Sequence, residues 1–196
     1  MSTRSLLRSV VAALCGVVVA AGMTARVDAQ TRGTPERYNA TAINMGSGPA
    51  VAGRVLIEVD RWTSPADREK LLKLFVEKGA DKLLDALQDS PKVGYIRLPQ
   101  TLAWDLRYAF ESPLPEGGRR VVLVTDRPIG FKEAASSSRR LDYPFTMIEI
   151  RFTPDGVGAG KMSVYTKISL SKDKQTIELE NYGIEPVRLT EVRIEK

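Results

Sequence analysis

The sequence of 196 residues contains no histidine, and its single cysteine, Cys15, lies inside an N-terminal segment with the features of an export signal. We therefore expect a mature chain that has neither residue. This absence excludes the usual general base of enzymes, the most common zinc ligands and all thiol chemistry. It also excludes a Ser-His-Asp triad. Without a disulfide, an exported domain must be stabilised by its hydrophobic core.

The first 29 residues have the three parts of a secretory signal. Arg4 and Arg8 form a positive start, Val10–Gly22 is an uncharged apolar core, and small side chains precede a cleavage point before Gln30. The apolar run is short for a membrane span and is rich in alanine and glycine rather than leucine. We expect a cleaved signal over residues 1–29 and a periplasmic or extracellular protein with no integral membrane span. An uncleaved anchor and lipidation of Cys15 are the alternatives.

Positive and negative charges are nearly balanced, with 29 lysine and arginine residues against 24 acidic residues. The charges alternate along the chain and form no dense basic block, which argues against a nucleic-acid partner. The chain that remains after the signal has the length of one domain. We expect a flexible stretch over residues 30–37 and a single β-rich globular domain over residues 38–196.

The sequence pattern of residues 64–90 predicts a pair of helices inserted into the domain. Ser64 is a good N-cap, and Pro65 suits the first helical position. Gly79 ends the first helix, and Pro91 ends the second. The spacing of the apolar residues favours packing on a sheet, with a partner-binding amphipathic helix as the alternative. The apolar stripe contains Leu71, Leu72, Phe75, Val76, Leu83, Leu84 and Leu87.

Alternating apolar and polar residues predict strands over most of the remaining chain. Short turns between them favour antiparallel neighbours. We therefore expect an α+β, β-rich fold in which an antiparallel sheet of about eight or nine strands forms a barrel or a sandwich and carries the helical pair. The predicted strands are Tyr38–Met45, Val51–Trp62, Val93–Leu98, Ala103–Glu111, Arg119–Asp126, Phe145–Phe152, Gly160–Leu170, Thr176–Tyr182 and Pro186–Ile194.

Acidic residues and arginines recur within two positions of each other and close to aromatic residues. In a strand, Asp105 and Arg107 share one face, and Trp104, Leu106 and Tyr108 share the other. If these segments meet at one end of the sheet, they form a polar, aromatic-rimmed pocket for an anionic or polyhydroxylated ligand. The alternative is a set of ordinary surface ion pairs. The candidate ligand-binding residues are Trp104, Asp105, Arg107, Asp126, Arg127, Asp142 and Tyr143.

Short segments spread over nearly the whole mature chain resemble a family of exported bacterial proteins of unknown function. The resemblance implies a complete exported domain, and it implies no activity or ligand. The segments that carry it are Asp60-Arg61-Trp62, Gly94-Tyr95-Ile96-Arg97, Trp104-Asp105-Leu106-Arg107-Tyr108, Gly117-Gly118-Arg119-Arg120, Thr125-Asp126-Arg127-Pro128-Ile129, Asp142-Tyr143-Pro144-Phe145-Thr146 and Glu178-Leu179-Glu180-Asn181-Tyr182.

The residue types favour a non-enzymatic exported domain that binds a small molecule or a cell-envelope partner, without a cofactor or a metal. A structural module without a pocket is one alternative. The other is a hydrolase that uses paired carboxylates, which needs neither histidine nor cysteine. Its carboxylates would come from Asp60, Asp105, Glu111, Asp126, Asp142 or Glu149.

Overall fold

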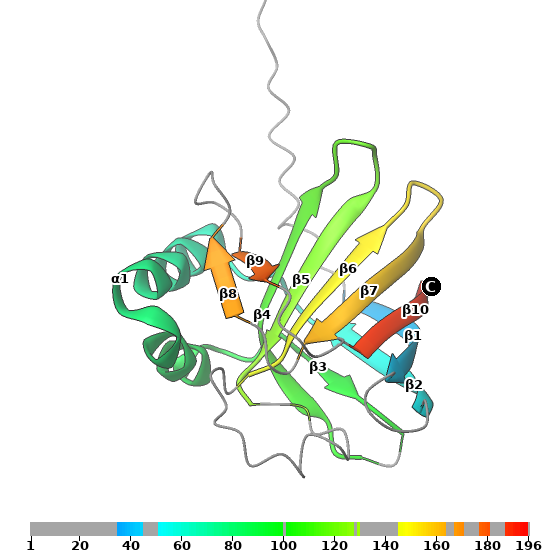
Figure 1. Cartoon of the computed structure of the whole chain (residues 1–196), viewed down its shortest axis with the longest axis horizontal. Helices are drawn as coiled ribbons and strands as arrows, with labels where there is room; N and C mark the ends of the chain where they lie inside the picture. Colours follow the sequence, from blue (N-terminus) through cyan, green and yellow to red (C-terminus); the bar gives the residue numbers. More distant parts are fainter. Residues whose placement is uncertain are drawn as a thin grey trace, which may run out of the picture.

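A computed structural model describes residues 35–44, 51–99, 101–127, 129, 145–163, 167–170, 177–180 and 187–195. Eight of the described strands form a closed antiparallel barrel in the order β1-β10-β7-β6-β5-β4-β3-β2 (Figure 1). Successive strands are neighbours from β1 to β7, and β10 closes the barrel between β7 and β1. The barrel strands are β1 (Glu36–Asn44), β2 (Val51–Val59), β3 (Gly94–Arg97), β4 (Trp104–Pro113), β5 (Arg119–Thr125), β6 (Met147–Phe152), β7 (Val157–Ser163) and β10 (Val187–Glu195).

The expected β-rich α+β fold with a helical pair is confirmed, and the sheet is a barrel rather than a sandwich. The predicted strand Gly160–Leu170 is wrong as a single element. It is divided between β7 and β8 (Lys167–Leu170), and β8 pairs with β9 (Ile177–Glu180) in a separate two-stranded sheet. The strand β7 begins early, at Val157, because a tight turn joins Thr153 to Val157 through a 2.9 Å backbone hydrogen bond.

The strand β1 begins two residues before the predicted position. Glu36 and Arg37, which we expected in a flexible stretch, pair in register with Val59 and Glu58 of β2. Their side chains also form ion pairs, Arg37 with Glu58 and Glu36 with Arg119. These contacts order the start of the domain. The expected signal segment and residues 30–34 lie outside the described residues.

The helix α1 (Pro65–Asp89) begins and ends as the sequence predicts. The Ser64 hydroxyl accepts a hydrogen bond from the backbone nitrogen of Asp67 at 3.1 Å, and the Ser90 backbone nitrogen donates to the carbonyl of Leu87. Gly79 has a φ of 79° and a ψ of −172°, so it interrupts the helix. Residues 65–78 therefore form a first arm and residues 80–89 a second arm. Figure 1 shows the two arms as a V beside the barrel.

Inward-facing side chains from all eight barrel strands fill the interior. Between Leu189 and Val192 of β10, a bulge at Glu191 lets both apolar residues face inward. The glycines of β7 leave room for larger neighbours, since a Cβ at Gly158 would lie 2.8 Å from ring atoms of Phe152. Fully buried members of this core include Tyr38, Val55, Ile57, Ile96, Leu106, Leu123, Ile148, Ile150, Met162 and Leu189.

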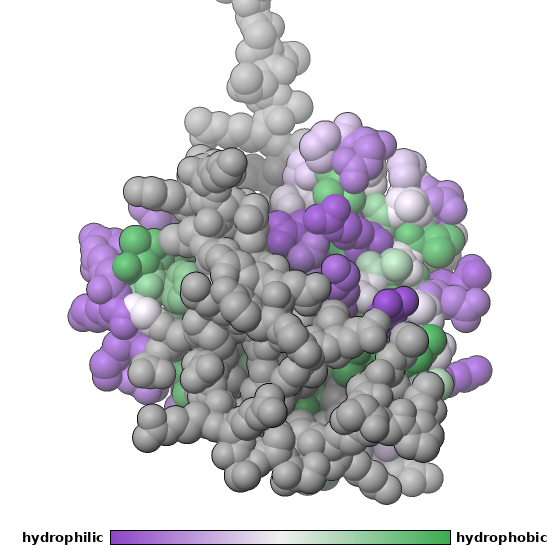
Figure 2. Space-filling view, viewed as in Figure 1, coloured by the Kyte–Doolittle hydropathy of each residue, from purple (hydrophilic) through white to green (hydrophobic). Residues whose placement is uncertain are grey.

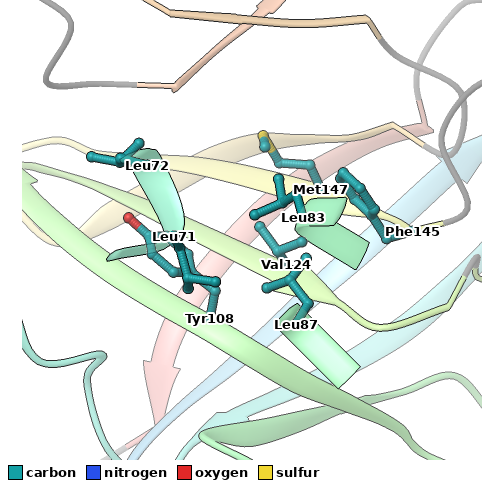
Figure 3. Close-up of a pocket in the computed structure, with 8 residues that line it drawn as sticks. All are labelled: Leu71, Leu72, Leu83, Leu87, Tyr108, Val124, Phe145 and Met147. Atoms are coloured by element: carbon teal, nitrogen blue, oxygen red, sulfur yellow. The ribbon is translucent and has the colours of Figure 1, made fainter. Parts of the chain in front are cut away.

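A second apolar cluster lies between α1 and the outer wall of the barrel (Figure 3). Leu71, Leu83 and Leu87 are buried there, and Phe75 and Leu84 are partly buried. The cavity among them is only about 10 Å³, the space of a single water molecule. The prediction that the helical stripe packs on the sheet is confirmed. Val76 departs from it, because 55% of this residue is exposed.

Among the described residues, no helix combines the length and the apolar character needed to cross a membrane.

Candidate functional site

Three of the predicted site residues meet on the outer wall of β4 and β5. Arg107 Nε donates a hydrogen bond to Asp126 Oδ2 at 2.8 Å, and Arg107 Nη2 lies 3.6 Å from Asp105 Oδ2. Lys92, just before β3, adds a second cation, with its Nζ 2.9 Å from Asp105 Oδ1. The predicted Asp105–Arg107 pair therefore does form one spatial cluster with Asp126.

A bulge in β4 positions Arg107. Leu106 pairs with β5, Tyr108 pairs with the next residue of β5, and Arg107 between them has no partner in the register. Because of this extra residue, Leu106 faces into the barrel and Tyr108 faces outward against α1. The expectation that Tyr108 shares a face with Trp104 and Leu106 is wrong for that reason. Trp104 itself is partly buried against the interior core.

Arg127, another predicted site residue, bonds to a backbone group outside this cluster. Arg127 Nη2 donates to the backbone carbonyl of Ala103 at 3.1 Å instead of pairing with Asp126. Asp142 and Tyr143 lie outside the described residues. Of the aromatic side chains predicted beside this cluster, Trp104 packs against the interior core and Tyr108 packs against α1.

Arg107 uses its donors within the protein. Besides its bond to Asp126, Arg107 Nη1 donates to the backbone carbonyl of Ser90 at 3.0 Å. Gln88 Nε2 lies 3.4 Å from the carbonyl oxygen of Asp126. These bonds connect the end of α1 to the barrel wall. An anionic ligand would have to displace them, so Arg107 acts as a connection between elements rather than as an open anion site.

The cluster continues as a row of polar side chains across four strands. Arg37, Glu58, Tyr95 and Asp105 are directly opposite one another in the register of β1, β2, β3 and β4. Arg37 Nε donates to Glu58 at 2.6 Å, and the Tyr95 hydroxyl donates to Glu58 at 3.0 Å. We call this outer surface the charged belt, defined as Arg37, Glu58, Lys92, Tyr95, Asp105, Arg107 and Asp126.

The pKa values of two neighbouring carboxyl groups in this region, Glu58 and Asp60, are shifted in opposite directions. The bond from Arg37 holds the pKa of Glu58 below its ordinary value. Burial, followed by the charge of Glu58, raises the pKa of Asp60. Glu58 and Asp60 each influence the pKa of the other, so they are neighbouring carboxyl groups on the outside of the barrel.

A second ion cluster, which sequence reasoning missed, lies inside one end of the barrel. Arg119 Nη2 is 2.5 Å from Glu36 Oε2, and Arg119 Nη1 donates to Glu111. The Tyr38 hydroxyl donates to Glu36 at 2.6 Å, and the Arg119 guanidinium lies 5.2 Å from the ring centroid of Phe152. Because β1 and β5 are opposite each other in the ring of strands, this cluster connects two facing walls.

Burial and hydrogen bonds both shift the pKa values of side chains in this inner cluster. Burial alone would lower the pKa of Arg119, but its hydrogen bonds with the two carboxylates raise it above the ordinary value. Burial is also the main reason why the pKa of Tyr38 is raised. Arg119 and Tyr38 therefore remain protonated, and the cluster holds one cation between two carboxylates. The alternation that places Val121 and Leu123 inward is the signal that could have placed Arg119 inward as well.

Two carboxyl pairs in the described structure are Glu58 with Asp60, and Glu36 with Glu111, which share Arg119. Arginine hydrogen bonds engage a carboxylate of each pair. Asp105 and Asp126 are likewise bonded to Arg107, and Glu149 is bonded to arginines. Within the described part of the chain, no group of three or more acidic side chains is arranged to hold a metal ion.

A groove lies outside the barrel, along α1. It has a volume of about 390 Å³ and is lined by both arms of the helix. Lys70, Leu74 and Lys78 line it from the first arm, and Asp85, Ala86 and Asp89 line it from the second. Ser90, which accepts the hydrogen bond from Arg107, is also part of the lining, so this groove adjoins the charged belt.

The resemblance to an exported bacterial family stays a prediction. Comparisons with protein-family models, with curated proteins and with solved structures find no match to this chain.

Proposed function

We propose that this protein is an exported, non-enzymatic domain that binds a component of the cell envelope through its outer surface, with the charged belt as the contact. The export signal at residues 1–29 supports the location. The absence of histidine and the placement of the single cysteine in that signal support a non-enzymatic role.

The filled barrel interior is the observation that carries the proposal. An eight-stranded barrel has room either for its own side chains or for one small ligand. Here apolar side chains from all eight strands occupy the interior, and Tyr38, Ile57 and Leu106 in it are fully buried. The Arg119 ion cluster occupies one end. A partner is therefore expected on the exterior rather than inside the barrel.

The charged belt has the properties of a preorganised polar contact. Lys92 and Asp105 are partly exposed, at 45% and 37% of their side chains, and they are held 2.9 Å apart. Arg107 fixes Asp105 from the other side. Charges of both signs in a fixed arrangement favour a partner with the complementary arrangement, because such surfaces provide specificity more than raw affinity.

A structural module without a binding partner is the second candidate, and the filled interior favours it as well. A carboxylate hydrolase has less support. Glu58 and Asp60 are neighbouring carboxyl groups, but the pair lies on the outer wall, and Glu58 is bonded to Arg37 and Tyr95. The acid and the nucleophile of a glycoside hydrolase are two carboxyl groups that flank the bond to be cleaved, so a substrate must fit between them. A pair on the outer wall, with one member already bonded to Arg37 and Tyr95, does not provide that arrangement.

Intact and native mass spectrometry of the exported protein test the first part of the proposal. We expect a chain that begins at Gln30 and carries no small molecule. Retention of residues 1–29, or an added lipid mass at Cys15, would contradict the proposed export. A stoichiometric small molecule that survives purification would contradict binding through the exterior alone.

Site-specific photo-crosslinking in the exporting cell tests the contact surface. A photoreactive residue at Asp105 on β4 should give an adduct, and one at Arg188 on β10 is the matched control because β10 is on the opposite wall. The partner identified in the adduct is then purified and titrated. Asp105→Lys should weaken its binding by about tenfold or more, which is 1.4 kcal/mol, and Arg188→Glu should not. Equal adducts at both positions, or none at Asp105, would refute the belt contact and favour the structural module.

A further inference from the structure

The groove along α1 has opposite charge on its two sides. The first arm lines it with Lys70, Lys78 and Asp67, which gives a net positive side. The second arm lines it with Lys82, Asp85 and Asp89, which gives a net negative side. The floor between them contains apolar side chains such as Leu74 and Ala86. In Figure 2, hydrophilic residues dominate the left edge, where α1 lies, with a small hydrophobic area among them.

Several of these charges are not neutralised within the described part of the chain. Lys70, Lys78 and Asp89 are exposed, and no ion pair joins them to another described residue. Lys82 and Asp85 are 2.9 Å apart, but both are 61% exposed, and such surface pairs contribute little. The groove therefore presents charges that an outside surface can still neutralise.

From this arrangement we propose that the groove binds a second copy of this chain, so that the first arm of each copy lies against the second arm of the other. A two-fold dimer brings the same patch of both copies together, so the patch must be complementary to itself. A surface with a positive half and a negative half meets this condition. A second copy is also the occupant whose complementary charges are already present in this structure.

The size of the arms indicates a weak dimer. At 1.5 Å per residue, arms of 14 and 10 residues are about 21 and 15 Å long, and a helix is about 10 Å wide. Their combined footprint is about 350 Å², less than the roughly 800 Å² per partner of a stable complex. Charge therefore contributes a large share of the association, and we expect salt to weaken it. This contact is separate from the charged belt and does not depend on the proposed function.

A charge-swap experiment in sedimentation equilibrium at about 50 mM salt tests the dimer. The first variant, Lys70→Glu with Lys78→Glu, makes both arms negative. The second, Asp85→Lys with Asp89→Lys, makes both arms positive. Native protein should self-associate, and each variant alone should associate at least about tenfold more weakly. An equimolar mixture of the two variants should associate again, since each negative arm then meets a positive one.

The control is Lys73→Glu with Glu77→Lys. These residues lie on the same arm but do not line the groove, and the exchange retains their ion pair and the net charge. This control should associate as the native protein does. Unchanged melting temperatures would show that all variants fold. A native protein that remains monomeric, or variants that associate like the native protein, would overturn the proposal, and so would a mixture of the variants that fails to associate. None of these results would affect crosslinking at Asp105.

Discussion

Replacing Arg119 with methionine removes the cation that bonds to both carboxylates of the ion cluster inside the barrel end. Its guanidinium bonds to Glu36 and Glu111, and only 15% of the Arg119 side chain and 4% of the Glu111 side chain are exposed. Methionine keeps an unbranched apolar stem next to Phe152 but carries no charge. The two carboxylates would then lie in the barrel end without the positive charge that faces them in the native protein.

The expected loss of stability is about 3–5 kcal/mol, the usual cost of removing one member of a buried ion pair. A typical domain has a free energy of unfolding of about 5–15 kcal/mol, so this loss is a large fraction of the total. Removing all three charges should behave differently, because no charge is then left buried. We expect the triple variant Glu36→Gln, Glu111→Leu, Arg119→Met to be close to the native protein in stability. Glutamine at position 36 keeps an acceptor for the Tyr38 hydroxyl.

Urea unfolding at pH 7, followed by the fluorescence of Trp62 and Trp104, measures these differences. Arg151→Met is the matched control. Arg151 bonds to Glu149 at 2.9 Å, but 61% of its side chain is exposed on the outer wall, so its loss should cost less than about 1 kcal/mol. The reasoning is refuted if Arg119→Met costs no more than Arg151→Met. A triple variant as unstable as Arg119→Met alone would also refute it.

Three further predictions concern α1 and other strands of the barrel. Leu87→Ala should lower the free energy of unfolding, measured in urea, by about 2–5 kcal/mol, since Leu87 is only 2% exposed. The control Val76→Ala, at an exposed position of the same helix, should lower it by less than about 0.5 kcal/mol. Equal losses would mean that α1 does not pack as described. Glu191 has a φ of 52°, so Glu191→Gly should raise the free energy of unfolding by about 1 kcal/mol, and a lower urea midpoint would contradict the strain. Burial alone would raise the pKa of Glu149, but its bonds with Arg151 and a second arginine lower it below the ordinary 4.5. The stability that these bonds provide is complete above about pH 4.5 and is lost as the pH falls through the lowered pKa of Glu149. Glu149→Gln should therefore make the free energy of unfolding fall less steeply as the pH is lowered. An unchanged slope of the free energy of unfolding against pH would exclude this contribution.

Local signals in the sequence predict the elements well, because each depends on neighbouring residues. The alternation of Val55, Ile57 and Val59 predicts an inward face of β2, and all three are buried in the barrel. Ser64 and Gly79 predict the start of α1 and its interruption, and both positions are confirmed. The spacing of Asp105 and Arg107 within two residues also predicts a local cluster, and Asp126 joins it from the adjacent strand.

Features that depend on one inserted residue are harder to predict. Period-two alternation places Tyr108 on the same face as Leu106, but the bulge at Arg107 reverses the alternation from that point on. The same effect at Glu191 lets Leu189 and Val192, three residues apart, both face inward. No local residue preference marks Arg107 or Glu191 as a bulge, since neither is a glycine.

Closure of the barrel is the reason why the inner ion cluster could not be predicted. Alternation with Val121 and Leu123 places Arg119 on an inward face, and a charge at such a position needs a partner. Glu111 is on the adjacent strand, so a hairpin prediction can find it. Glu36 is 83 residues away from Arg119, on the facing wall. It reaches Arg119 only because β10 joins β7 to β1 and closes the ring, and that pairing depends on contacts between the two ends of the domain. An inward-facing arginine in a predicted antiparallel sheet therefore predicts a buried carboxylate partner, which an adjacent strand, as at Glu111, or a facing wall, as at Glu36, can provide.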